Sequence, residues 1–100
     1  MVPLEKVKDI ILKHDSLEKE LSSGKIEAKL IAKTSKEYSN LRNIISIARE
    51  YVNFEKEKKD LINIIEDKKN DQEIIDLAQK DLEELKNKKN KYENELKIFL

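Results

Sequence analysis

Hydrophobic residues recur every three or four positions along the last third of the chain. The line runs through Ile75, Ala78, Leu82, Leu85, Lys89, Tyr92, Leu96 and Phe99. This spacing keeps one stripe on one face of an α-helix, as in the seam of a coiled coil. A stripe of this kind is stable only when another helix covers it, so the rest of the chain must supply that helix. Lys89 is the charged residue in the line, and its alkyl stem can pack while its ammonium group reaches water.

The N-terminal two thirds carry two more helical patterns. The first helix is predicted to begin at Pro3, a residue favoured in the first turn, and to end at the only glycine, Gly24, which suits a left-handed cap. Its apolar face comprises Val7, Ile10, Ile11, His14, Leu17 and Leu21. A second helix is predicted over residues 25–66. Thr34 interrupts its apolar line, so residues 25–33 form either a separate turn or a kinked first section.

A third helix is predicted to follow a short break at residues 67–71. Asn70, with Glu73 three residues later, fits the N-cap arrangement at its start, and the helix continues from Asp71 to the C-terminus. With a rise of roughly 1.5 Å per residue, the second helix is about 60 Å long and the third about 40 Å. Because the connection between them is short, these two helices are expected to form an antiparallel hairpin.

The predicted fold class is therefore all-α: an elongated antiparallel three-helix bundle, or helical hairpin, with a coiled-coil-like seam. Residues 1–100 are expected to form a single helical domain. Given the predicted helix lengths, only the zone of residues 38–45 lies within reach of all three helices. The sequence predicts that Val7, Ile10, Leu96 and Phe99 meet in that zone.

Composition narrows the classes of partner. Lys and Arg number 21, as do Asp and Glu, so the net charge of zero gives no argument for nucleic acid or an acidic membrane. The absence of cysteine excludes a disulfide framework and a thiolate metal site. No apolar run approaches the roughly 20 residues that span a bilayer. The sequence predicts a cytoplasmic protein that has no membrane partner.

Residues that could carry chemistry are few. His14 is the only histidine, and it lies on the apolar face of the first helix without a second base nearby, which favours a packed structural role over proton transfer. One glycine cannot make a phosphate-binding loop, and no arrangement for nucleophilic catalysis is present. We therefore expect no enzyme activity from this chain alone, no catalytic or metal-binding residues, no cofactor and no small-molecule ligand.

Residues 34–41 read Thr-Ser-Lys-Glu-Tyr-Ser-Asn-Leu, and residues 77–85 read Leu-Ala-Gln-Lys-Asp-Leu-Glu-Glu-Leu. These stretches resemble the N-terminal domain of bacterial and organellar class 1 peptide chain release factors, with a form closer to the release factor 1 type. Residues 34–41 are similar to the Leu-Ser-(Lys/Arg)-Glu-Tyr-Ala-x-Leu element of the family. Residues 77–85 match a second element, Met-Ala-x-(Asp/Glu)-Glu-Leu-x-Glu-Leu. Residues 17–21 and 95–100 are similar to family segments at corresponding positions. The resemblance covers essentially the whole chain.

The resemblance implies a role in translation termination. In the family, this domain docks at the stalk base of the large ribosomal subunit, among rRNA and protein. The element that reads the stop codon and the Gly-Gly-Gln loop that triggers hydrolysis lie downstream. The chain is accordingly expected to be an N-terminal fragment of a longer protein, without the codon-reading and catalytic domains. Lys68 and Lys69, at the predicted hairpin tip, are the candidate ribosome contacts.

Two other functions remain open at this point. A tRNA-binding helical arm would carry a basic stripe along one exposed face, which the balanced charge does not favour. A self-associating coiled coil would use the stripe of the last helix to seal a dimer, whereas an intramolecular bundle predicts a monomer.

Overall fold

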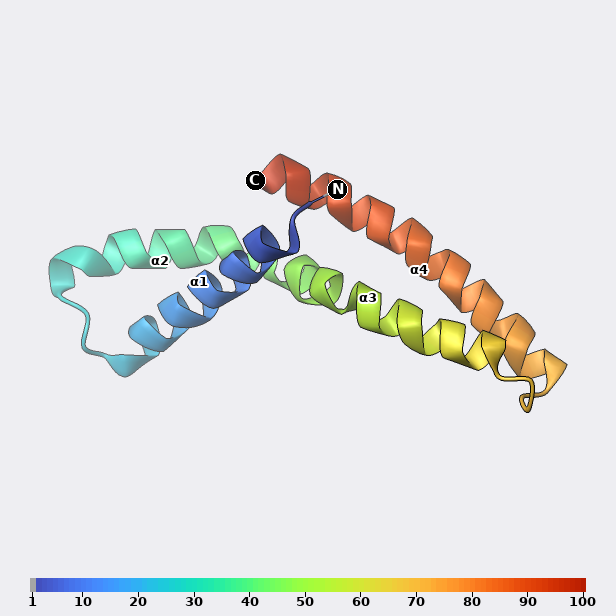
Figure 1. Cartoon of the computed structure of the whole chain (residues 1–100). Helices are drawn as coiled ribbons and strands as arrows, with labels where there is room; N and C mark the ends of the chain where they lie inside the picture. Colours follow the sequence, from blue (N-terminus) through green and yellow to red (C-terminus); the bar gives the residue numbers. More distant parts are fainter. Residues whose placement is uncertain (1) are drawn as a thin grey trace.

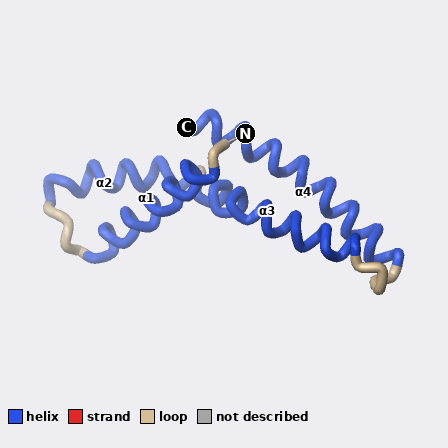
Figure 2. Tube along the Cα trace, in the orientation of Figure 1, coloured by secondary structure: helices blue, strands red, loops and turns tan. Residues whose placement is uncertain are grey.

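The computed structural model describes residues 2–100, and this part of the chain is all-α with four helices (Figure 1). Helix α1 spans Leu4–Ser23, α2 Ala28–Arg42, α3 Ile45–Glu66 and α4 Gln72–Phe99. The first two helices form one hairpin and the last two form another. The two hairpins extend in opposite directions from a common junction (Figure 2). The molecule measures 61 × 27 × 19 Å, so it is elongated as predicted.

The second predicted helix is divided in two, and the three-helix part of the prediction is wrong. The division lies at Asn43 and Ile44, whereas Thr34 lies inside α2. The amide of Ile44 donates to the carbonyl of Leu41 at 3.1 Å, a tighter turn than that of an α-helix. This turn brings both Leu41 and Ile44 into the core. Asn43 keeps helical backbone angles (φ −71°, ψ −24°), so the chain bends without needing glycine or proline.

The ends of the helices follow the sequence signals to within a few residues. Gly24 adopts the left-handed conformation (φ 69°) and ends α1, as predicted. Pro3 is extended (φ −60°, ψ 130°), so α1 begins one residue later than predicted. The N-cap of α4 is Asp71, and the prediction of Asn70 is wrong. Asn70 instead donates from Nδ2 to the carbonyl of Ile64 (3.0 Å), which closes the end of α3.

The hydrophobic core lies at the junction of the two hairpins. It comprises Val2, Val7, Ile10, Leu17, Leu41, Ile44, Ala48, Tyr51, Phe54 and Leu96. Val7, Ile10 and Leu96 meet there, as predicted, but Phe99 is 38% exposed. The core includes residues 41–54 rather than 38–45. It is displaced because α1 packs across both α2 and α3 at the bend, a geometry that one straight second helix could not provide.

Helices α3 and α4 pack along the predicted seam. Ala78 and Leu96 are buried, and the positions between them in the heptad line are half-buried. The aromatic rings of Phe54 and Tyr92 lie 5.7 Å apart across the seam. Lys89 Nζ lies 3.2 Å from a carboxylate oxygen of Glu55, so its stem packs and its charge is paired at the edge. The antiparallel hairpin is confirmed.

Helix α2 is the least buried of the four. Only Leu41 is buried in it, while Leu30 and Ile31 are 44% and 46% exposed. Because fewer buried contacts lower the free energy of local opening, we expect amides of residues 30–36 to exchange with solvent faster than amides of residues 48–54. Hydrogen-exchange mass spectrometry on the free chain measures this difference. Equal protection of the two segments would contradict the prediction.

Candidate functional site

The tip of the α3/α4 hairpin presents Lys68 and Lys69 to solvent, at the position predicted from the sequence. A carboxylate oxygen of Asp67 accepts a hydrogen bond from the amide of Lys69 (2.9 Å), and the carbonyl of Asp67 accepts one from the amide of Asn70 (3.1 Å). The bond from Asn70 to Ile64 ties this turn to α3. These contacts hold the backbone in a compact turn, and both lysine side chains remain exposed.

A second basic group lies on α3. Lys56, Lys58 and Lys59 line a shallow groove together with Glu55 and Ile62. This group was not predicted from the sequence, although the run Lys-Glu-Lys-Lys at residues 56–59 was its signal. Such a run on a helix is usually a solvated face, so only the grouping around Ile62 makes it notable.

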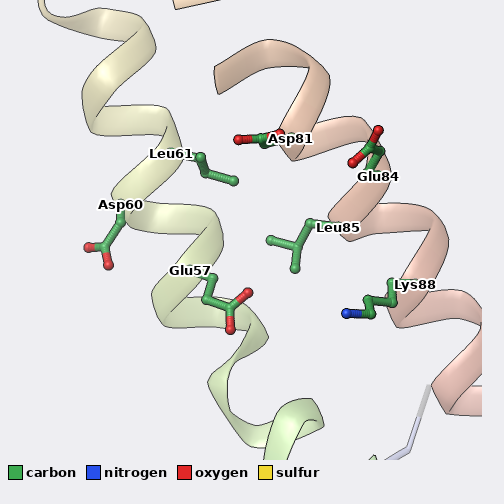
Figure 3. Close-up of a pocket in the computed structure, with 7 residues that line it drawn as sticks. All are labelled: Glu57, Asp60, Leu61, Asp81, Glu84, Leu85 and Lys88. Carbon is green, nitrogen blue, oxygen red and sulfur yellow. The ribbon is translucent and has the colours of Figure 1, made fainter. Parts of the chain in front are cut away.

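An open groove between α3 and α4 lies along a different side of the hairpin (Figure 3). It is lined by Glu57, Asp60, Leu61, Asp81, Glu84, Leu85 and Lys88. Leu61 and Leu85 extend toward one another between the two helices, with carboxylates around them. Because an α-helix has about 3.6 residues per turn, Glu57 and Leu61 share one side of α3, while Lys59 and Ile62 lie toward the opposite side. The hairpin therefore has two sides of different charge.

A polar cluster around His14 joins three helices. The ring of His14 is buried and stacks on Tyr38 of α2, with ring centroids 5.0 Å apart. Its Nδ1 lies 2.9 Å from Asp15, and Asp15 also accepts a hydrogen bond from Arg49 of α3 (2.6 Å). Tyr38 donates its hydroxyl hydrogen to Glu18 (3.0 Å). His14 thus packs structurally, as predicted, and links α1 to α2, while Asp15 links α1 to α3 through Arg49.

These contacts perturb two of the groups in the cluster. The hydrogen bond with His14 lowers the pKa of Asp15, and the nearby Arg49 guanidinium lowers it further. The hydrogen bond to Glu18 raises the pKa of Tyr38, because the phenolate would face a carboxylate. The effect on Tyr38 and the contribution of Arg49 to the effect on Asp15 follow from contacts between helices.

Residues 2–100 contain no group of three or more His, Cys, Asp or Glu side chains placed to hold a metal ion. Among the described helices, none is long and apolar enough to cross a membrane. The α3/α4 hairpin carries three charged features: the exposed lysines at its tip, the basic group on α3 and the acidic groove. Surfaces of this kind bind charged macromolecules.

Comparison with known proteins gives a family and several relatives. The family model described as the PCRF domain matches residues 10–100. The chain is 47% identical over 100 residues to a protein named Peptide chain release factor 1 from Pelagibacter ubique (strain HTCC1062). It is 37% identical over 91 residues to the protein of that name from Orientia tsutsugamushi (strain Boryong), and 30% identical over 99 residues to the one from Rhizobium rhizogenes.

The matches cover most of this chain but little of the relatives. They span 100% of the chain and 28% of the Pelagibacter protein, 91% and 25% for the Orientia protein, and 99% and 27% for the Rhizobium protein. The chain thus corresponds to about a quarter of the length of these relatives. No solved structure matches it significantly.

Proposed function

This chain belongs to the PCRF domain family of peptide chain release factors, and we propose that it is the N-terminal, ribosome-docking domain of a factor of the release factor 1 type. The observation that carries the proposal is the 47% identity to a release factor 1 over all 100 residues. In this role the domain helps to hold a translation termination factor on the ribosome in the cytoplasm. Other parts of the longer protein would read the stop codon and trigger release of the nascent peptide.

We propose that the domain binds the stalk base of the large ribosomal subunit, and that Lys68 and Lys69 make the contacts. The support is chemical: two exposed ammonium groups on a held turn suit phosphate groups of rRNA, whose charge dominates the affinity of RNA-binding surfaces. The elongated shape of the molecule favours contact between the α3/α4 hairpin tip and the ribosome, because the tip is the part farthest from the core along α3 and α4.

The two alternatives are less favoured. A tRNA-binding arm needs a basic stripe along the hairpin, but the basic group on α3 is confined to residues 56–59 beside Glu55. Another side of the hairpin carries the carboxylates of Glu57, Asp60, Asp81 and Glu84. A self-associating coiled coil needs the α4 seam to be free, but α3 covers it. We therefore propose that the domain acts as a monomer.

Reversal of the charges at the tip tests the proposal. We expect Lys68→Glu with Lys69→Glu to weaken binding of the chain to ribosomes about tenfold at low salt, because ammonium–phosphate contacts would become repulsive. Co-sedimentation with 70S ribosomes measures the affinity. The matched control is Lys25→Glu with Lys33→Glu, an equal charge change at exposed positions near the other hairpin end.

Two results would contradict the proposal. Failure of the wild-type chain to bind ribosomes would remove the docking role itself. Equal weakening by the control pair would instead remove Lys68 and Lys69 as specific contacts. In the same samples, stop-programmed ribosomes that carry a labelled peptide should keep that peptide when only this chain is added.

A further inference from the structure

Exposed hydrophobic residues extend the acidic groove toward the hairpin tip. Ile74 and Leu77 on α4 are 48% and 60% exposed. Because residues three, four and seven apart lie on the same side of a helix, Ile74, Leu77 and Asp81 share the side of Leu85 that faces the groove. The groove is therefore part of a longer amphipathic strip with Leu61, Ile74, Leu77 and Leu85 as its apolar positions. We call this strip the acidic side.

The carboxylates of the acidic side have no close cationic partner. Within residues 2–100, none of the ion pairs with atoms 4.0 Å or less apart includes Glu57, Asp60, Asp81 or Glu84. Lys88 is the cation among the residues that line the groove, and its Nζ lies 6.0 Å from the centre of the Tyr92 ring. Four negative charges thus accompany one positive charge around an apolar floor.

We infer that the acidic side is a docking surface for a basic amphipathic helix of another protein. Two adjacent antiparallel helices form a groove into which a third helix can pack its apolar stripe. The occupant would place Leu or Ile side chains, spaced three and four residues apart, on Leu61, Leu77 and Leu85. Lys or Arg residues beside that stripe would meet the four carboxylates. This inference goes beyond the proposed function and does not depend on it.

Charge decides among the classes of occupant. RNA is disfavoured because its phosphates would face Glu57, Asp60, Asp81 and Glu84. A second copy of this chain in a twofold contact is disfavoured for the same reason, since a twofold axis places each patch against itself. A helix with a basic, apolar face complements both the charge and the floor of the groove.

The test uses a defined probe, a 21-residue fluorescent peptide with Leu at the a and d heptad positions and Lys at most others. We expect it to bind the chain, and a peptide with Glu in place of Lys not to bind. Asp60→Lys with Asp81→Lys should weaken binding at least tenfold, since the attraction between these exposed carboxylates and the lysines of the peptide becomes repulsion. Leu77→Ser should weaken it about threefold or more, because less apolar area is buried. Fluorescence anisotropy measures each affinity.

The matched control is Glu66→Lys with Glu83→Lys, the same charge change away from the acidic side. This control should change peptide affinity less than twofold. An equal loss of affinity in both double variants would show that the peptide binds through general charge attraction alone, which would overturn the inference. Unchanged binding by Leu77→Ser would also overturn it, and this exposed position keeps the test decisive if the double variant folds poorly.

Two further outcomes would reassign the surface. Direct binding of a fluorescent 12-base-pair RNA hairpin to the chain, weakened by Leu77→Ser, would make the acidic side an RNA site and overturn the inference. Concentration-dependent dimerisation that Leu77→Ser abolishes, measured by sedimentation equilibrium, would assign the surface to a second copy and likewise overturn it.

Discussion

Leu96→Ala is expected to destabilise the chain by about 3 kcal/mol, within the range of roughly 2–5 kcal/mol found for buried leucines. Leu96 is fully buried, and it brings α4 to the core that α1 and α3 share. Truncation would remove apolar contacts and leave a cavity between helices that meet at an angle and cannot easily close together. A urea melt followed by circular dichroism measures the free energy of unfolding.

Leu82→Ala is the matched control for this prediction. Leu82 lies on the same seam but is only half-buried and is covered by α3 alone, so we expect a loss of about 1 kcal/mol, well below that of a buried leucine. Equal destabilisation by the two variants would show that the seam contributes as much to stability as the junction core, and it would contradict the prediction.

Ala48→Leu is expected to destabilise the chain by about 2 kcal/mol through overpacking. Ala48 is fully buried in α3, in the core at the junction of the two hairpins. A larger side chain there must push helices apart or adopt a strained rotamer. Thermal unfolding should therefore begin at a lower temperature.

The control for Ala48→Leu is Ala32→Leu, because Ala32 is exposed on α2 and should accept the larger side chain with a change of about 0.5 kcal/mol or less. If Ala48→Leu melts at the same temperature as the wild-type chain, the junction core has room for a larger side chain and the prediction is contradicted. The packing around Ala48 would then not limit the size of the side chain.

Much of the fold was predictable because local signals agree with the final packing. The three- and four-residue spacing from Ile75 to Leu96 gave the seam, and Gly24 gave the end of α1. The division at Asn43 and Ile44 was not predictable. Its backbone stays nearly helical, and the bend is favoured by the burial of residues from both sides of it against α1, which no local pattern records.

The candidate site was predictable to a smaller extent. The location of Lys68 and Lys69 at a hairpin tip follows from the break in the hydrophobic pattern, and the resemblance to release factors is confirmed at the level of the family. The acidic groove was missed, because Leu61 and Leu85 belong to different helices and come together only in the folded hairpin. The antiparallel register that pairs them has to be known before the groove can be recognised.

The bend at the junction makes the hairpin a lever. With a rise of roughly 1.5 Å per residue, the 22 residues of α3 extend about 33 Å from Ile45 to the tip, so a rotation of about 10° at the bend displaces the tip by about 6 Å. The stacking of His14 on Tyr38 and the contact between Asp15 and Arg49 restrict movement at the bend. The direction in which Lys68 and Lys69 point is thus set by side chains at the opposite end of α3, and small changes in core volume there are magnified at the surface.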